Sequence, residues 1–400
     1  MNVISTTPSL SRGRRNLAFL VFLSSVFCYL SSASAEEPFV RVAILQDAES
    51  ARVTVEGPAR LTDLDSGAKL ADWTDLKWKL VESAGPGLQI GEAGFPSQAV
   101  LLTPAKNPVF RVNSRAYRGA LILRRSSAGK LTVINRLPLE EYLVGALTSE
   151  TSPKWPMEAL KAHAVVSRTM VAHRIWIRKG EPFDVTADTS THLYYGKAAE
   201  RGRTRQAVEE TQRQVLAYQG ELFSATFHAN CGGHTESAAE LWQTKKEIEP
   251  LAGVVDPNCR DLRHYRWKMF LSHAELERFL EPAAPGAGEL QGLEVLDRNA
   301  SGRVREIRIT GAQGEAVLTG RRLRELMGAN RLRSLKFTVT PFVEGFSFSG
   351  FGWGHGVGFC QWGAYGMARR GKKMDEILSF YFPGAQRRKL PGLPGFDSLL

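Results

Sequence analysis

Apolar residues predict a long helix over residues 156–178. Leu160, Ala164, Val171 and Ile175 recur at intervals of three and four and share one helical face. Arg168 is the single charged residue on that face. Pro156 suits the first helical position, because its missing N–H needs no partner there. A guanidinium on an apolar face is costly unless it has a partner or a ligand. Glu150 lies in the turn-forming segment before the helix. It is the candidate ion-pair partner of Arg168, or a second residue of the same functional site.

Shorter segments of the chain show the patterns of strands and of further helices. Strands and hairpins are expected at residues 36–60, 119–135 and 293–309. Helices are expected at residues 204–214, 274–279, 320–326 and 374–381. This mixture is typical of an α+β protein with antiparallel strands, hairpins and several helices. We expect a small β-rich N-terminal domain at 36–110, a larger domain at 111–388 and a short tail at 389–400.

The first 35 residues are predicted to be a secretory signal peptide and are set aside from the fold. Three arginines, Arg12, Arg14 and Arg15, precede an apolar run from Leu17 to Leu30, and Ala33-Ser34-Ala35 resembles a cleavage site. The run is shorter than the ~20 residues that a membrane helix needs. We therefore expect an exported, soluble protein without a transmembrane segment after cleavage, located in the periplasm or associated with the cell wall.

The charge of the chain allows a basic surface or an anionic partner. The formal net charge is +11, and removal of the three signal arginines lowers it to +8. A solvated basic surface explains this excess, as does binding to an anionic lipid or to an acidic wall polymer. Export argues against a nucleic-acid partner, and no basic motif interleaved with aromatic residues is found.

Cysteine usage favours a disulfide. Three cysteines remain after the signal segment, and in an oxidising compartment a pair of them is expected to be bonded, with Cys231–Cys259 as the preferred pair. Reduced structural thiols are one alternative. Another is a metal held by Cys231 and Cys259 together with His228 and His234, although the spacing of these four residues is not that of a standard zinc finger.

A glycine-rich loop at residues 350–366 is the second candidate for chemistry. Its backbone can approach a ligand closely, and His355 and Gln361 are candidate sugar contacts within it. Tyr195 is a further candidate contact, at the end of a Thr- and Ser-rich loop. A tight packing turn with a satisfied histidine remains an equally good interpretation of His355.

Two motifs resemble those of the sporulation stage II protein D / LytB amidase-enhancer family. The first comprises Leu139–Leu143, Ser149-Glu150, Trp155–Ala162 and Ser167–Thr169, and the second comprises Gly352–Gly358 with Gln361–Ala364. The resemblance covers roughly residues 110–388. It implies cleavage of peptidoglycan by lytic transglycosylation in sporulation members, and stimulation of a peptidoglycan amidase in LytB members. It also assigns the catalytic acid to Glu150 and a neighbouring arginine to Arg168.

The resemblance implies a zinc site in some members, in the loop that corresponds to Asp184–Gly196. Here His192 is present, but Ala187 and Leu193 occupy the positions where thiols are expected. We therefore expect neither a metal nor another cofactor, with zinc as the disfavoured alternative.

A single carboxyl group suits lytic transglycosylation, which produces 1,6-anhydro-N-acetylmuramic acid ends. Ordinary glycoside hydrolysis usually needs two carboxylates. Glu150 would act as an acid and then as a base on glycan strands, with a pKa raised by burial. The alternatives are a non-catalytic activator of an amidase and a pure glycan-binding module. For Glu150 a carboxylate at a helix N-terminus is the structural alternative, and for Arg168 it is a structural ion pair.

The two residues can meet only if the chain folds back. At about 1.5 Å per residue, Arg168 lies roughly 18 Å from the first turn of its helix. The segment from Glu150 to Pro156 must therefore run back along the helix for Arg168 to serve Glu150.

Overall fold

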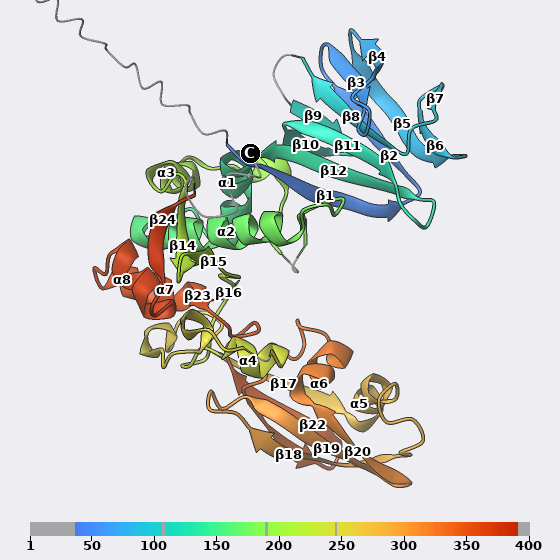
Figure 1. Ribbon diagram of the computed structural model, residues 1–400. Helices are drawn as coiled ribbons and strands as arrows, with labels where there is room; N and C mark the ends of the chain where they lie inside the picture. Colours follow the sequence, from blue (N-terminus) through green and yellow to red (C-terminus); the bar gives the residue numbers. More distant parts are fainter. Residues whose placement is uncertain (1–36, 106–108, 189–190, 245, 391–400) are drawn as a thin grey trace, which may run out of the picture. The chain divides into compact units, whose positions relative to one another are not determined.

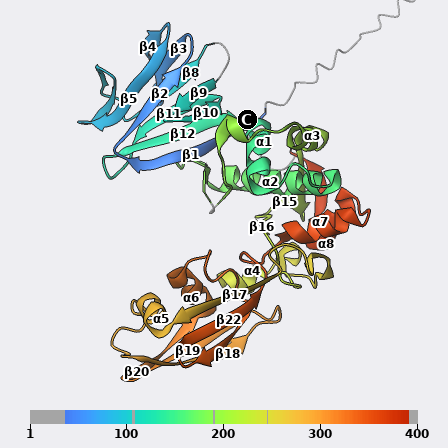
Figure 2. The same cartoon turned by 180° about the vertical axis from the view of Figure 1, so that it is seen from behind.

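The computed structural model describes residues 37–105, 109–188, 191–244 and 246–390. The predicted signal peptide and most of the predicted tail lie outside these ranges. The described part contains helices and several antiparallel sheets, which confirms the α+β class (Figures 1 and 2). Within it, no helix combines the length and the apolar character needed to span a bilayer.

The first half of the described chain forms two sheets around a shared apolar core; their pairings are antiparallel except for the parallel pair β1–β13. One sheet has the order β13-β1-β12-β11-β8-β3-β4. Its strands are β13 (Val185–Thr186), β1 (Phe39–Ala48), β12 (Leu131–Pro138), β11 (Ala120–Arg125), β8 (Ala99–Pro104), β3 (Ala59–Asp63) and β4 (Lys69–Trp73). The expected hairpin is β11–β12, and Gly129 in its turn has φ of 76°.

The second sheet has the order β10-β9-β2-β5-β6-β7. Its strands are β10 (Arg115–Arg118), β9 (Val109–Val112), β2 (Ser50–Val55), β5 (Leu76–Ala84), β6 (Gly87–Ile90) and β7 (Ala93–Phe95). The sheets do not end at residue 110, because β10 pairs with β9, and β11 and β12 pair with β8 and β1. The hydrogen-bonded sheets therefore continue into the segment where we expected the second domain.

The helix α2 (Met157–Ile177) confirms the long helix expected from the sequence. It is buried on most sides rather than along one stripe, since nearly all residues from Ala159 to Ala172 are inaccessible. It contacts helices and strands that are distant in sequence: α1 (Leu139–Glu150), α3 (Gly202–Glu210), β14 (Gln214–Tyr218), α7 (Gln361–Arg369) and α8 (Met374–Tyr381). In Figure 1 the red helices α7 and α8 lie beside the green α2. The motif at residues 352–364 therefore lies next to the motif at residues 139–169.

A long inserted segment, residues 229–358, lies between β16 (Phe227–His228) and β23 (Phe359–Cys360) and is called the excursion below. These two strands pair in parallel at its base. The excursion contains two three-stranded sheets and three helices: β17 (Arg266–Ser272), β22 (Gly345–Phe351), β21 (Phe337–Phe342), β18 (Leu290–Arg298), β19 (Val304–Gly311), β20 (Gly314–Thr319), α4 (Ala238–Trp242), α5 (His273–Leu280) and α6 (Gly320–Met327). It has its own apolar core. The hairpin β18–β19 and the helices α5 and α6 lie where the sequence predicted them.

The remaining strands are short. β14 pairs with β15 (Glu221–Leu222) and with β24 (Gln386–Lys389). Single turns of 3-10 helix occur at η1 (Gly196–Ala199), η2 (Glu249–Leu251) and η3 (Pro257–Cys259).

Candidate functional site

A cavity of ≈ 960 Å³ contains the end of α1 and parts of the glycine-rich loop. Its lining comes from α1, α2, the segment 224–229, α4, the segment 324–331, the loop at 353–355 and the start of α7. Glu150 is the only carboxylate among the described lining residues, which also include three arginines and two tryptophans: Arg174, Arg324, Arg331, Trp242 and Trp353. A cavity of this size, with aromatic side chains and converging polar groups, is typical of ligand sites.

Glu150 is the last residue of α1, not the first residue of a helix. The structural alternative for Glu150, a carboxylate at a helix N-terminus, is therefore excluded. Its Oε1 accepts a hydrogen bond of 2.8 Å from the backbone N–H of Leu193. Burial raises the pKa of Glu150 above its usual value, and the contacts from Leu193 and Gln361 oppose that rise only in part. A carboxyl group in this setting holds its proton more readily than a surface glutamate.

Gln361, the first residue of α7, lies beside Glu150. Its side chain is close enough to lower the pKa of Glu150, but its Nε2 has no hydrogen-bond partner among the described residues. Only 6% of Gln361 is exposed, and it lines the cavity. A buried amide without a partner is unfavourable, so this donor is available for a ligand.

His355 is held by its own loop. Its Nδ1 accepts a hydrogen bond of 3.0 Å from the backbone N–H of Val357. Burial and the nearby charge of Arg324 lower its pKa to about 4, so the imidazole is neutral at neutral pH. The neighbouring His228 donates from Nδ1 to the Val357 carbonyl at 3.1 Å. Its buried Nε2 has no partner among the described residues, which leaves a bare acceptor in the wall of the cavity.

Arg168 does not meet Glu150 in the structure, and its guanidinium points into the protein instead of the cavity. Its side chain is completely buried, and Nε and Nη2 form a bidentate pair with Glu140 at 2.8 and 2.6 Å. Its remaining donors reach the carbonyls of Val208 and Gln214. All guanidinium nitrogens thus have acceptors inside the protein, which is the geometry of the structural ion pair considered for Arg168.

Tyr195 also lies outside the cavity lining. It is 42% exposed, and the guanidinium of Arg115 lies 5.3 Å from its ring centre. The arginine of α2 that does line the cavity is Arg174, six residues after Arg168 and about 240° further around the helix. Sequence periodicity singled out Arg168 on one apolar stripe, but α2 is buried on most sides, so that stripe does not indicate which arginine faces the cavity.

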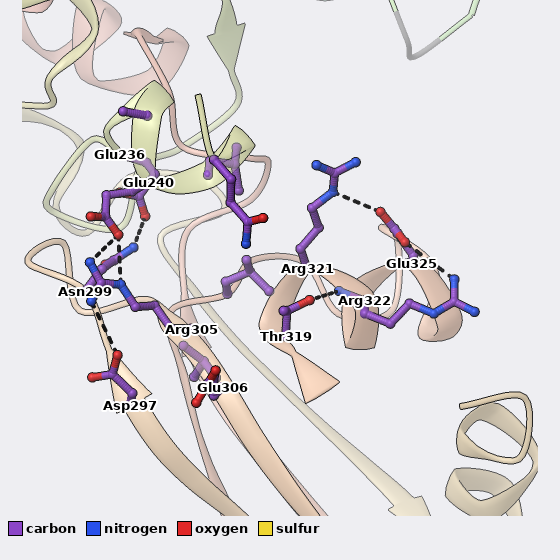
Figure 3. A pocket seen from close by; sticks show the side chains of 15 residues that line it. Glu236, Glu240, Asp297, Asn299, Arg305, Glu306, Thr319, Arg321, Arg322 and Glu325 are labelled. Carbon is purple, nitrogen blue, oxygen red and sulfur yellow. Dashed lines mark hydrogen bonds and ion pairs between the residues drawn. The ribbon is translucent and has the colours of Figure 1, made fainter. Parts of the chain in front are cut away.

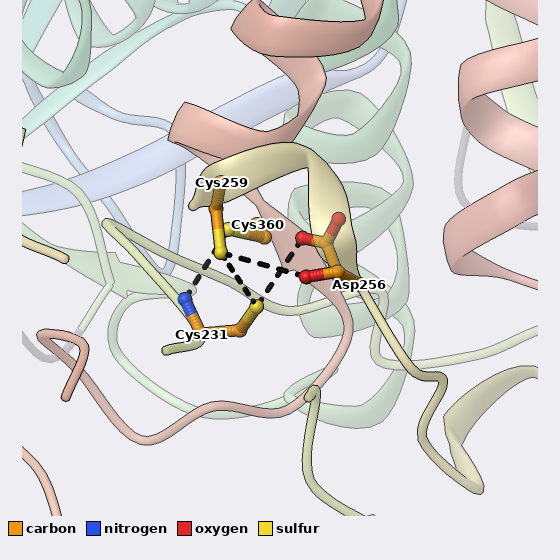
Figure 4. Close-up of side chains that lie close together, drawn as sticks. All are labelled: Cys231, Asp256, Cys259 and Cys360. Carbon is orange, nitrogen blue, oxygen red and sulfur yellow. Dashed lines mark hydrogen bonds between the residues drawn. The ribbon is translucent and has the colours of Figure 1, made fainter. Parts of the chain in front are cut away.

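The disulfide expected between Cys231 and Cys259 is not formed in the structure. Their sulfur atoms lie 3.3 Å apart, which exceeds a bonded distance of about 2.05 Å. Cys360 and Asp256 lie against them, so these four side chains form one buried cluster (Figure 4). The two histidines considered beside Cys231 are engaged elsewhere, since His228 and His234 use Nδ1 to contact the carbonyls of Val357 and Thr235.

A second hollow, of ≈ 680 Å³, lies between α4, β19 and α6. Figure 3 shows that its charged side chains contact one another: Arg305 pairs with Glu240, and Arg321 pairs with Glu325. None of the residues predicted for the site lines it. Its charges are satisfied internally, so it is a weaker candidate than the cavity that contains Glu150.

Sequence comparisons agree with the motifs that line this cavity. Residues 127–218, which include Glu150, match the family described as Stage II sporulation protein, and residues 235–358 match a domain of unknown function. An uncharacterised protein of Brachyspira hyodysenteriae is 31% identical over 353 residues, which cover 88% of this chain and 93% of that protein.

Two relatives from Bacillus subtilis have descriptive names. Stage II sporulation protein D is 26% identical over 331 residues, with 76% of this chain and 85% of that protein covered. The Amidase enhancer is 27% identical over 285 residues, with 60% of this chain and 39% of that protein covered. With Glu150 and the glycine-rich loop gathered around one cavity, the chain belongs to the stage II sporulation protein D / LytB family, whose members have cell-wall-related roles.

Proposed function

We propose that this protein is a lytic transglycosylase that cleaves peptidoglycan glycan strands, with Glu150 as its single acid and base. The observation that carries the proposal is that Glu150 is the only carboxyl group among the described residues lining the cavity. Hydrolases that use two carboxyl groups place them on either side of the bond, at separations of roughly 5–10 Å. The described residues of this lining include no second carboxylate, which favours a reaction that needs only one.

The raised pKa of Glu150 suits the first step. The protonated carboxyl donates its proton to the glycosidic oxygen between N-acetylmuramic acid and N-acetylglucosamine, and the bond from C1 to that oxygen breaks. The C6 hydroxyl oxygen of the muramoyl residue then bonds to C1, and its proton passes to the Glu150 carboxylate. The products are a 1,6-anhydro end and a free N-acetylglucosamine end, and Glu150 is again protonated. No water is consumed.

The other lining residues supply binding groups for a glycan. Trp353 and Trp242 offer ring faces on which pyranose rings can pack. The unpartnered Nε2 of Gln361 is a donor for a sugar hydroxyl or acetamido carbonyl next to Glu150. Arg174 and Arg324 provide positive charge for the carboxylates of lactyl groups or stem peptides. The predicted export of the chain would deliver this site to the periplasm or the cell wall.

Digestion of purified, peptide-free glycan strands tests the proposal, with the products identified by mass spectrometry. The wild-type protein should release fragments with 1,6-anhydro ends. Glu150→Gln should lower the rate at least about 100-fold, because a positioned acid and base contributes roughly 10²–10⁴.

The matched control is Glu141→Gln, on the same helix but paired with Arg205 outside the cavity. It should keep the wild-type rate. Reducing ends without an anhydro ring, or full activity in Glu150→Gln, would contradict the proposed reaction.

A second candidate function is activation of a peptidoglycan amidase. It is favoured by the relative named Amidase enhancer. In this case the cavity would bind glycan without cleaving it. Stimulation of a purified amidase that persists in Glu150→Gln, together with absent anhydro products from the wild type, would support activation over catalysis.

A further inference from the structure

Three thiols and one carboxylate converge at the base of the long excursion between β16 and β23. One potential ligand atom from each of Cys231, Asp256, Cys259 and Cys360 lies within 4.8 Å of the other three (Figure 4). All four residues are buried with no accessible surface. They come from distant parts of the chain, because Cys231 and Cys360 are 129 residues apart.

We propose that Cys231, Cys259, Cys360 and Asp256 bind one structural Zn²⁺ ion. Zinc prefers four ligands in a tetrahedron and accepts thiolate sulfur and carboxylate oxygen. With Zn–S bonds of about 2.3 Å, tetrahedral geometry places ligand atoms about 3.8 Å apart. The observed limit of 4.8 Å and the sulfur separation of 3.3 Å are close to that value, so small side-chain shifts complete the site.

Backbone donors in the cluster suit a thiolate. The backbone N–H groups of Cys231 and Gly363 point at Cys360 Sγ, at 3.2 and 3.3 Å. Zinc binds cysteine as the thiolate, and two N–H donors stabilise negative charge on that sulfur.

Two cations, the buried Arg303 and the half-buried Lys336, match the charge of such a centre. Three thiolates and one carboxylate outweigh Zn²⁺ by two negative charges. The fully buried Arg303 donates to the Cys231 carbonyl at 2.9 Å, and Lys336 donates to the Gly232 carbonyl at 3.0 Å. The carboxylate closest to Arg303, that of Glu236, lies 3.9 Å away.

The carboxylate ligand is held in place by a second contact. The hydroxyl of Tyr381 donates to Asp256 Oδ2 at 2.9 Å, and the backbone N–H of Asn258 donates to Oδ1 at 2.8 Å. Such contacts orient metal ligands and tune their affinity. A Cβ atom at Gly363 would lie 2.0 Å from the Tyr381 hydroxyl and 2.4 Å from Asp256 Oδ2, so the cluster has no room for a larger residue there.

From the position of the cluster, the ion would stabilise the fold by holding distant segments of the chain together. Cys231 and Cys360 bracket residues 235–358, so the metal would join both ends of that segment. Cys360 also directly precedes Gln361, the amide next to Glu150. A zinc ion here would therefore fix the base of the excursion and one wall of the cavity. It would take no part in catalysis, because all four coordination positions are filled by protein.

Elemental analysis of the purified protein tests the site. We expect about one zinc per chain without added metal, and removal by a strong chelator should lower the melting temperature and expose three reactive thiols. Cys259→Ser and Asp256→Asn should lose most of the zinc. Asp261→Asn, a substitution of an exposed carboxylate nearby, should keep it. Tyr381→Phe should retain the ligands but bind zinc about 10- to 100-fold more weakly.

Reconstitution keeps the test decisive if a cysteine variant fails to fold. Chelator-treated wild-type protein should take up one Co²⁺ with the absorption bands of tetrahedral thiolate coordination, and Zn²⁺ should displace it. Failure to bind either metal would overturn the proposal. So would a Cys231–Cys259 disulfide in protein purified without reductant, found by peptide mass spectrometry.

Discussion

At the residue scale, the environment of Glu150 makes it suitable as an acid. The side chain lies at the end of α1, where burial raises its pKa and one backbone donor, from Leu193, holds its orientation. The neighbouring side chain of Gln361 opposes the rise in part. The balance of these contacts sets the pH range in which Glu150 can start the reaction protonated.

Substitution of Gln361 should shift the pH dependence of cleavage. Gln361→Ala removes a contact that lowers the pKa of Glu150, so that pKa should rise. The alkaline limb of the pH–rate profile follows loss of the catalytic proton, and it should move to higher pH. The measurement is the rate of anhydro-product formation between acidic and alkaline pH. Tyr195→Ala, outside the cavity, should leave the limb in place, and a shift to lower pH in Gln361→Ala would contradict the role assigned to this contact.

At the scale of elements, a buried ion pair joins α1 to α2. Arg168 of α2 and Glu140 of α1 form two hydrogen bonds, and the Glu140 side chain is only 14% exposed. The pair sits ten residues before Glu150 on the same helix. It therefore fixes α1, and with it Glu150, against the central helix.

Removal of Arg168 should destabilise the fold instead of weakening substrate binding. Arg168→Met leaves the Glu140 carboxylate buried without its partner, which should lower the free energy of unfolding by about 3–5 kcal/mol. Urea denaturation measures the change. Arg321→Ala, in an exposed pair with Glu325, is the control and should cost at most about 1 kcal/mol. A raised KM in Arg168→Met with unchanged stability would restore the substrate-binding interpretation.

At the scale of the whole molecule, the excess of positive charge suits an anionic wall polymer. The formal charge is +11 for the full chain. Arg174, Arg324 and Arg331 line the cavity beside a single carboxylate, so the charge at the site has the same sign as the whole. Opposite charges accelerate encounter and strengthen weak binding over distances of about one Debye length.

Binding to isolated cell-wall sacculi should therefore weaken with salt. The Debye length falls from about 10 Å at 0.1 M to about 3 Å at 1 M salt, so co-sedimentation should decrease over this range. Arg331→Gln should reduce the salt dependence, whereas Arg260→Gln, which is exposed and does not line the cavity, should change it less. Retention that is independent of salt would show that charge contributes little to wall binding.

The sequence alone determined the fold class, the helix at 157–177 and the hairpin β11–β12, because local periodicity and turn residues specify such elements. It also pointed to Glu150 through the motif resemblance, and to His355 and Gln361 through the glycine-rich loop; the fold brings these three residues into one cavity. The roles of these residues remain proposals.

Only the tertiary structure decided which charged and sulfur-bearing groups meet. Arg168 pairs with Glu140 because α2 is covered on most sides, a fact that periodicity along one stripe does not reveal. Cys360 lies against Cys231 and Cys259 because β16 and β23, at the two ends of the excursion, pair with each other. Contacts between segments this distant in sequence depend on the packing of the entire chain, and local sequence patterns do not predict them.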